Sequence, residues 1–369
     1  MTTKSFKTLF LLPIIATIVA IILTRFLTSD VNSDLFLSKV CGSSDIEVSD
    51  FYNRIRSGGS MRRLSNEMAI VNIDTVINRA ELASLISSIA VASPKIIGVD
   101  VLFEEEKDPY EDDILVSTLN GTQNLVMGQR YDESNCSSSE DFITKLCPDI
   151  PRGIVNLTSK KRNGIVREYS SFFGNESIFP SLAASMLKVI SPEKYEELPK
   201  IQKEELIRFQ PEEYIILEPS EVTDNPEYLK DKIVFVGTIS EESDLHSTPL
   251  SDDYPGVMIH ANILSMQLRS DYTCPYSKTY TFILGIVPCL IMTFLYVRLS
   301  STQNFTMRTL PIVWMISILL FGCYLFNNFG IYVDAPRTIL IPSLALVILD
   351  TWFAAGVLIA KIKNRFIKK

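Results

Sequence analysis

Two histidines and two aspartates carry the side chains that a ligand site would need. His246 and His260 are the only histidines of the chain, and Asp74 and Asp100 lie near the ends of two apolar runs that predict strands. Since the carboxyl ends of parallel strands meet at one edge of a sheet, these four side chains are expected around a crevice there. Imidazole and carboxylate suit a ligand, zinc or another divalent ion, or the detection of protons, because the usual histidine pKa is about 6.5.

A structural role is the favoured interpretation of the two histidines. His246 would hold a loop, and His260 would pack at the start of a helix. Ligand or proton sensing and metal binding remain as alternatives. No cofactor and no metal site is predicted.

Enzymatic activity has little support in the sequence. The chain contains no G-x-S-x-G elbow, Walker loop, H-E-x-x-H helix or G-x-G-x-x-G turn. Asp74 and Asp100 could act as paired catalytic acids only at a defined separation, which a sequence does not give. We therefore expect a protein that is not an enzyme and has no catalytic residue.

An acidic run, EEEKDPYEDD, covers residues 104–113. It would suit calcium or a cationic ligand, but the order of its carboxylates does not match an EF-hand loop. We interpret it as a solvated loop ahead of a helix whose dipole favours Asp112 and Asp113.

The elements that position these residues follow from the apolar periodicity. MAIVNID (68–74) predicts a strand, residues 79–92 predict a helix, and KIIGVDVLF (95–103) predicts a second strand. This order makes a right-handed crossover and implies parallel pairing. Further elements are expected as helix 112–120, strand 124–128, helix 179–190 with Pro180 in its first turn, strand 231–237 and helix 256–269.

Two segments in the middle of the chain are expected to pair with each other. GIVNLTS (153–159) and GIVREYSSFF (164–173) both have the composition of strands. Arg162-Asn163-Gly164 lies between them and is a turn signal, so we expect a hairpin.

Four apolar segments have the composition of membrane spans: 8–28, 280–297, 309–326 and 338–360. With its flanks, the first is long enough to cross about 30 Å of hydrocarbon. An uncleaved anchor is favoured over a signal peptide, because no small-x-small cleavage site follows it. Pro288, Pro311 and Pro342 are tolerated in membrane helices when neighbouring helices satisfy the freed carbonyls.

Basic residues give the orientation of these spans. Four spans place on one side the nine residues Lys4, Lys7, Arg298, Arg308, Lys361, Lys363, Arg365, Lys368 and Lys369. Removing these nine positive charges from the net charge of −8 leaves −17 for the rest of the chain. The large block between the first and second spans is therefore acidic and expected outside the cytoplasm, and nucleic acid is not an expected partner.

The sequence thus predicts an extracytoplasmic α/β domain with a mainly parallel sheet, and four transmembrane α-helices, one N-terminal and three C-terminal. The expected divisions are an anchor at 1–29, the outer domain at 30–275, three helices at 276–360 and a basic cytoplasmic tail at 361–369. The protein would lie in the inner (plasma) membrane with both termini in the cytoplasm.

Four of the six cysteines belong to the outer block. Cys136 with Cys147, and Cys41 with Cys274, are the favoured disulfides, because the first pair closes a short polar loop and the second flanks membrane spans. Free or alternatively paired thiols remain the alternative.

Asp350 lies near the middle of the last span, where a charge costs about 2.5–3.5 kcal/mol on insertion scales. Two interpretations stay open. The carboxyl group is protonated and hydrogen-bonded to Ser317, Thr293 or a tyrosine of the bundle, or it meets a basic or polar side chain on a partner's membrane helix.

Two short motifs resemble a known family. The segments DLHSTPL (244–250) and PGVMIHAN (255–262), after a strand that ends in glycine, are similar to the CHASE type-2 domain, a cyclase- and histidine-kinase-associated sensory extracellular domain. The likeness covers about residues 37–274 and extends to one span before and three after the domain. The motif residues Asp244 and Asn262 complete the ligand-binding candidates, with Asp74, Asp100, His246 and His260.

The resemblance implies an extracytoplasmic sensory domain for an unknown small-molecule or protein ligand. Family members often carry a kinase or cyclase after the last span, whereas nine residues follow Ala360 here. We therefore expect signalling through a separate output protein, in the cytoplasm or membrane. A homo-oligomer is a further possible partner arrangement. The alternative function is a structural or accessory subunit of a cell-envelope complex that senses nothing.

Overall fold

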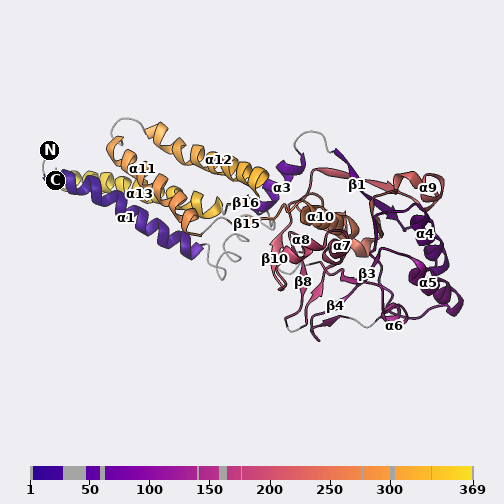
Figure 1. Ribbon diagram of the computed structural model, residues 1–369. Coiled ribbons are helices and arrows are strands. Elements are labelled where there is room, and N and C mark those ends of the chain that lie inside the picture. The colour runs from indigo at the N-terminus through magenta and orange to yellow at the C-terminus, as the bar shows by residue number, and fades with distance from the viewer. Residues whose placement is uncertain are drawn as a thin grey trace. The chain divides into compact units, whose positions relative to one another are not determined.

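The structure is a computed structural model that describes residues 3–27, 47–58, 63–138, 141–157, 164–175, 177–275, 278–299, 304–333 and 335–367. The chain divides into two compact units, Ser49–Thr273 and a second unit made of Met1–Val48 with Cys274–Lys369 (Figure 1).

A six-stranded sheet forms the centre of the first unit, in the order β11-β1-β12-β2-β3-β6. Its strands are β1 (Arg63–Asn72), β2 (Ile96–Val99), β3 (Leu125–Gln129), β6 (Arg152–Ile154), β11 (Glu212–Leu217) and β12 (Ile233–Gly237). All five pairings are parallel, which confirms the predicted α/β class with a mainly parallel sheet. In this order β12, the last strand of this sheet along the chain, lies between β1 and β2.

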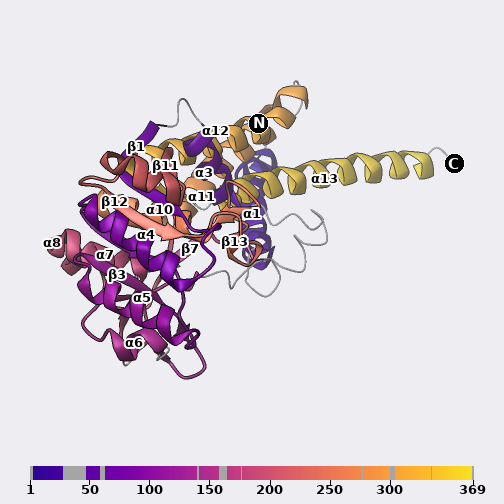
Figure 2. The same ribbon diagram turned by 90° about the vertical axis from the view of Figure 1, so that its right-hand side faces the viewer.

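Helices cover both faces of this sheet (Figures 1 and 2). Alternate side chains of β1 belong to different cores: Met68 and Ile70 to one, Ala69 and Val71 to the other. The helices of the first core are α7 (Leu182–Ile190) and α10 (Gly256–Leu268); those of the second are α4 (Arg79–Val91), α5 (Pro109–Gly121) and α9 (Pro219–Asp224). Because both faces are buried, the strands are apolar throughout.

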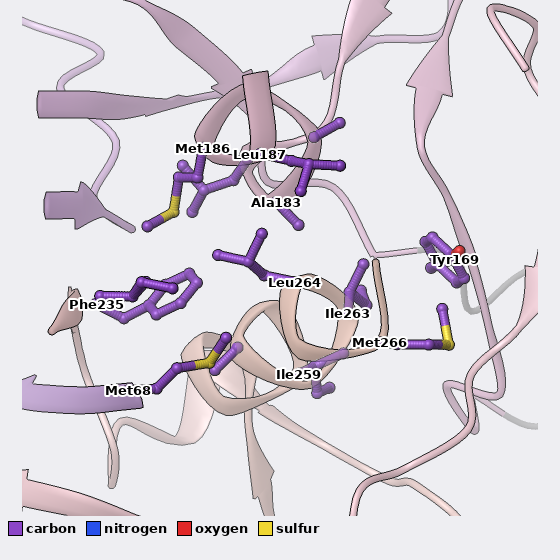
Figure 3. Packing of buried hydrophobic residues seen from close by; sticks show 14 of the residues in the cluster. Met68, Tyr169, Ala183, Met186, Leu187, Phe235, Ile259, Ile263, Leu264 and Met266 are labelled. Carbon is purple, nitrogen blue, oxygen red and sulfur yellow. The ribbon is translucent and has the colours of Figure 1, made fainter. Parts of the chain in front are cut away.

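The core between the sheet and α7 and α10 is closely packed (Figure 3). Met186 of α7 lies over Gly98 of β2, where a Cβ atom would overlap the methionine sulfur. Leu264 of α10 and Phe235 of β12 belong to the same buried cluster. The glycine in β2 therefore sets how closely α7 approaches the sheet.

A buried ion pair joins α4 to α5. Asp112 accepts a hydrogen bond from Arg79, and both side chains are almost fully buried. The rings of Phe103 and Phe142 lie 5.5 and 5.1 Å from the guanidinium carbon. Asp112 lies in the first turn of its helix, where the dipole favours it, but its side chain is buried, whereas its neighbour Asp113 is exposed.

The expected hairpin in the middle of the chain is wrong. Strand β6 instead pairs in parallel with β3 at the edge of the sheet, and β7 (Glu168–Ser170) pairs antiparallel with β10 (Glu204–Leu206). The turn residues 162 and 163 lie outside the described residues. The helix expected from residue 179 begins later, at Leu182, because Ser181 caps it by accepting a hydrogen bond from Ala184 N at 3.1 Å.

Shorter elements complete this unit. They are α3 (Val48–Gly58), α6 (Phe142–Leu146), α8 (Pro192–Glu197), η1 (Pro226–Tyr228), η2 (Glu242–Asp244), and the strand pairs β4 (Tyr131–Asp132) with β5 (Ser137–Ser138), β8 (Phe172–Phe173) with β9 (Phe179–Pro180), and β13 (Leu245–His246) with β14 (Tyr254–Pro255). Neither α3 nor β11 was expected from the sequence.

The Cys136–Cys147 disulfide is also wrong, since both residues are free thiols. Cys136 lies exposed in the turn between β4 and β5, with a left-handed φ of 48°. Cys147 ends α6 and is buried in the core beneath α4 and α5. Cys41 lies outside the described residues, so its pairing with Cys274 stays a prediction.

The second unit contains four long helices: α1 (Thr3–Leu27), α11 (Lys278–Leu299), α12 (Asn304–Phe329) and α13 (Ala335–Ile367). Within the described residues, two stretches are long and apolar enough to cross a membrane, Thr309–Phe329 and Thr338–Ile359. The apolar stretches Leu11–Phe26 and Ile283–Arg298 are shorter. Of the four predicted spans, two are therefore long and apolar enough to cross a membrane. A short parallel pair, β15 (Cys274–Pro275) with β16 (Ile331–Tyr332), completes this unit.

Replacing Asp112 tests the ion pair between α4 and α5. Asp112→Asn should lower the free energy of unfolding of the full chain in detergent by about 3 kcal/mol, because Arg79 keeps a buried charge without its carboxylate. The exposed neighbour is the control, and Asp113→Asn should change this free energy by less than about 0.5 kcal/mol. Equal losses in urea melts of the two variants would contradict the prediction.

Candidate functional site

Four of the six predicted ligand-binding residues lie together at the carboxyl edge of the sheet. Asp100 directly follows β2, and its Oδ2 is 3.9 Å from Nε2 of His260 on α10. In the chain after β12, Nε2 of His246 is 3.5 Å from Oδ1 of Asp244. Thr238 donates a hydrogen bond of 3.3 Å to the other oxygen of Asp244. We call Asp100, Asp244, His246 and His260 the Asp–His cluster.

Burial gives the inner pair of the cluster unusual acidities. Desolvation, with a smaller contribution from the negative charge of Asp244, raises the pKa of Asp100 to about 8. Desolvation lowers the pKa of His260 to about 4, although Asp244 acts in the opposite direction. The side chains are only 11% and 3% exposed. At neutral pH a protonated carboxyl group therefore faces a neutral imidazole, whose Nδ1 has no hydrogen-bond partner among the described residues.

Glycine residues bring the parts of the cluster together. A Cβ atom on Gly256, the first residue of α10, would lie 2.5 Å from Oδ1 of Asp244. The hairpin of β13 and β14 pairs His246 with Tyr254 and so holds the histidine close to this helix end. The Asp244 carboxylate thus lies against a helix N-terminus, where the dipole favours negative charge.

Asp74 does not join the cluster. Its carboxylate accepts hydrogen bonds from the backbone N–H groups of Ile239 and Ser240, at 3.0 and 3.1 Å, and from the Ser240 hydroxyl at 2.6 Å. Burial would raise the pKa of Asp74, but these bonds outweigh it and hold the pKa below its usual value. In this structure Asp74 therefore fixes the chain that leaves β12.

Asn262 is buried in α10 and also lies apart from the cluster. Its Oδ1 accepts a hydrogen bond from Gln210 N at 3.0 Å, and its Nδ2 donates to the Tyr254 hydroxyl at 3.0 Å and to Met258 O at 2.9 Å. These contacts tie the segment before β11 and the β14 strand to α10.

A metal site has no arranged ligand set in the part of the chain that the structure describes. No group of three or more His, Cys, Asp or Glu side chains there is placed to hold a metal ion.

Sequence reasoning missed a cavity of about 540 Å³ at the same edge of the sheet. We call it the edge cavity. Its lining comes from the chain after β1, β2 and β3 and from the starts of α4 and α5: Ile73, Val76, Ile77, Asn78, Arg79, Leu82, Val101, Leu102, Phe103, Glu104, Glu105, Lys107, Glu111 and Arg130. The acidic run at residues 104–113 supplies four of these residues and was a signal for the cavity, but no motif in the sequence connects Arg130 with that run.

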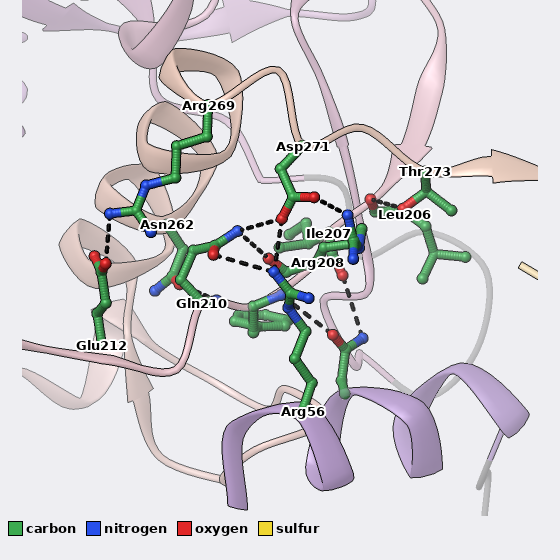
Figure 4. Close-up of polar contacts among 12 residues, drawn as sticks. Arg56, Leu206, Ile207, Arg208, Gln210, Glu212, Asn262, Arg269, Asp271 and Thr273 are labelled. Carbon is green, nitrogen blue, oxygen red and sulfur yellow. Dashed lines mark hydrogen bonds and ion pairs between the residues drawn. The ribbon is translucent and has the colours of Figure 1, made fainter. Parts of the chain in front are cut away.

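Helix α3 contacts the hairpin that carries His246 and the chain that follows α10. Arg54 donates a hydrogen bond of 2.8 Å to the carbonyl of Pro249, in the hairpin that carries His246. Arg56 reaches Asp271, beyond the end of α10, with Nη2 to Oδ2 at 2.7 Å (Figure 4). Arg208 binds the other oxygen of the same carboxylate.

In the helical unit, Asp350 accepts a hydrogen bond of 2.6 Å from the Tyr296 hydroxyl. Both residues line a cavity of about 260 Å³, together with residues that include Pro311 and Leu346. This bond fits the interpretation in which a tyrosine of the bundle binds Asp350. A contact with a partner's helix stays a prediction.

The first unit is a parallel α/β domain with a cavity and an ionisable cluster at the carboxyl edge of its sheet. A family model, the CHASE2 domain, matches residues 17–295, which is more than half of the chain. The chain belongs to the CHASE2 domain family. No curated protein and no solved structure matches it.

The Asp–His cluster predicts a defined dependence of stability on pH. Between about pH 4 and 8 folded Asp100 keeps a proton that the unfolded chain loses, so its contribution to stability falls as pH rises. Between about pH 4 and 6.5 folded His260 holds fewer protons than the unfolded chain, so its contribution rises. The two oppose each other up to pH 6.5, and only the Asp100 effect remains from there to pH 8.

Asp100→Asn should therefore remove a loss of stability that the natural chain shows between pH 6.5 and 8, of at most about 1.4 kcal/mol per pH unit. The measurement is the melting temperature of the full chain in detergent across this range. The control Asp113→Asn should keep the natural slope. An unchanged slope in Asp100→Asn would show that this carboxyl group does not titrate there.

Proposed function

We propose that this CHASE2 protein is a membrane-anchored sensory protein that detects a ligand at the carboxyl edge of its sheet. The observation that carries the proposal is the set of contacts between α3 and the chain around the Asp–His cluster. The proposed role is non-catalytic, because ligand binding can rearrange these contacts without a chemical reaction.

Helix α3 is the element that would transmit a conformational change at the site out of the α/β domain. It follows the N-terminal apolar segment in sequence, and Asp271 shortly precedes α11. The bond of Arg54 to Pro249 links α3 to the His246 hairpin, and the pair of Arg56 with Asp271 links it to the end of α10. A movement of either the hairpin or α10 therefore acts on both chain segments that lead to the helical unit.

Polar contacts also fix α3 to the body of the domain. Asp50 forms two hydrogen bonds with Arg167, at 2.7 and 2.8 Å, in a buried position. Asn53 donates to the carbonyl of Ile207 at 3.2 Å and accepts from Phe209 N at 3.1 Å. Such directional bonds define discrete arrangements, and a ligand that binds one arrangement better shifts the population toward it.

All four long helices are proposed to span the membrane. Small side chains, Ala16 and Ala20 of α1 and Ala345 of α13, are buried where the helices pack, whereas Ile18 and Ile22 of α1 are exposed. Small residues inside and large apolar residues outside are typical of membrane bundles. This supports spans for α1 and α11, although their apolar stretches are short.

The distribution of basic residues supports a proposed topology in the inner (plasma) membrane, with both termini in the cytoplasm and the α/β domain outside it. The proposed output is a separate protein in the cytoplasm or membrane that reads the helical unit. Asp350, with its bond to Tyr296, is the proposed contact within the bundle that such a protein would disturb.

Hydrogen exchange on the full chain in nanodiscs tests the proposed coupling. His246→Ala should increase the exchange rate at least threefold in residues 48–58 and 269–273, because it loosens the hairpin that holds Arg54. Lys203→Gln, at an exposed lysine that pairs with Glu205 elsewhere on the domain, is the control and should leave both segments unchanged. Faster exchange confined to residues 245–255 would favour the structural subunit that senses nothing.

Thiol labelling tests the proposed topology, because Cys136 is exposed on the domain. After mild reduction of intact cells, an impermeant maleimide should label a variant whose only cysteine is Cys136. A variant whose only cysteine replaces Lys369 should be labelled after permeabilisation alone. Labelling of both, or of neither, before permeabilisation would contradict four spans.

A further inference from the structure

The edge cavity has the size and position of a small-molecule site. Its volume of about 540 Å³ lies within the range of about 300–1,000 Å³ that ligand pockets occupy. It opens beyond the carboxyl ends of parallel strands, where ligands of open α/β sheets bind. Leu82, Val101 and Phe103 give it an apolar part that could hold a hydrocarbon group.

The charged side chains of the lining are balanced, with three cations, Arg79, Lys107 and Arg130, and three anions, Glu104, Glu105 and Glu111. Arg79 is already engaged, since its guanidinium binds Asp112 and the carbonyl of Glu105. Glu111 accepts a hydrogen bond of 3.3 Å from Arg79 N. Two of the six charged side chains, Arg79 and Glu111, are therefore already bound within the cavity wall.

Arg130 and Glu104 are the exchangeable pair. Their side chains are 56% and 55% exposed, and Nη1 lies 2.7 Å from Oε1. An ion pair this exposed contributes little to stability, so a ligand group can take the place of either partner at little cost. A ligand carboxylate on Arg130 would gain a charge-assisted and, in good geometry, bidentate bond.

The adjacency of the two charges selects the ligand class. An anion alone would bind Arg130 but would be repelled by the carboxylate of Glu104. A cation alone would bind Glu104 but would be repelled by the guanidinium of Arg130. A molecule with neighbouring carboxylate and ammonium groups pairs with both residues at once.

We infer that the edge cavity binds a small zwitterion with an apolar side chain, of the chemical class of the apolar α-amino acids. The carboxylate binds Arg130, the ammonium group binds Glu104, and the side chain packs against Leu82, Val101 and Phe103. This assignment names the ligand class of the proposed sensor and takes its biological meaning from that proposal, but binding is measured independently of signalling.

Calorimetry on the full chain in nanodiscs tests the assignment, with L-leucine, L-methionine and L-phenylalanine as probes. At least one should bind, and its N-acetyl and amide derivatives, which each carry one charge, should bind at least tenfold more weakly. Arg130→Gln and Glu104→Gln should each weaken binding at least tenfold. Lys203→Gln is the matched control and should not, since Lys203 is also 56% exposed and paired at 2.7 Å, with Glu205, outside the cavity.

The assignment is overturned if none of the three amino acids binds, if the single-charge derivatives bind equally well, or if both cavity variants bind normally. Melting temperatures without ligand, unchanged in the two variants, show that lost binding is not lost folding. Hydrogen exchange of α3 separates the two proposals. If leucine binds but the exchange rates of residues 48–58 do not change, the binding site stands and the proposed sensory function is overturned. If His246→Ala changes exchange in α3 but no amino acid binds, only the proposed ligand class is overturned.

Discussion

The insertion of β12 between β1 and β2 is the constraint on which the domain depends. The strand pairs with Met68–Asn72 on one side and with Ile96–Val99 on the other, although it lies more than 130 residues further along the chain. Without it the first two strands have no common neighbour, and the sheet is interrupted. The same insertion carries the chain after β12 to the α7 and α10 face, while β1 and β2 continue to α4 and α5. The carboxyl edge is therefore divided between two faces, with the edge cavity on one and the Asp–His cluster on the other.

Local elements of this fold could be predicted because their signals are local. The helix at Arg79–Val91, the strand at Ile233–Gly237 and the helix at Gly256–Leu268 follow from apolar periodicity and glycine or proline positions. The pairing of GIVREYSSFF could not, because Glu168–Ser170 takes a partner from residues 204–206 rather than from its sequence neighbour. Cysteine spacing misled for a related reason, since Cys136 lies in an exposed turn and Cys147 lies buried at the end of α6.

The candidate site shows the same division between local and distant information. The end of the strand at Ile96–Val99 indicated the edge at which Asp100 lies, 3.9 Å from His260, but Asp74 and Asn262 are hydrogen-bonded to neighbours that the sequence does not place beside them. The contacts of α3 could not be predicted from the sequence either. Its buried polar residues have the composition of a solvated surface, and only the tertiary structure supplies Arg167 for Asp50 and the carbonyl of Ile207 for Asn53.

The end of β12 is where the cavity and the cluster meet. Ile73, in the cavity lining, donates its N–H to the carbonyl of Gly237 at 3.2 Å. A Cβ atom on Gly237 would lie 2.9 Å from the Cβ of Val257 on α10 and 3.4 Å from that of Asp100. One backbone residue thus touches the cavity wall, the helix that carries His260 and the acid that faces it. Contact alone does not transmit a signal, but a strand end packed this tightly cannot deform by small continuous steps. A ligand that shifts Ile73 must either leave β12 in place or move α10 with it, and α10 leads to Asp271 and α3.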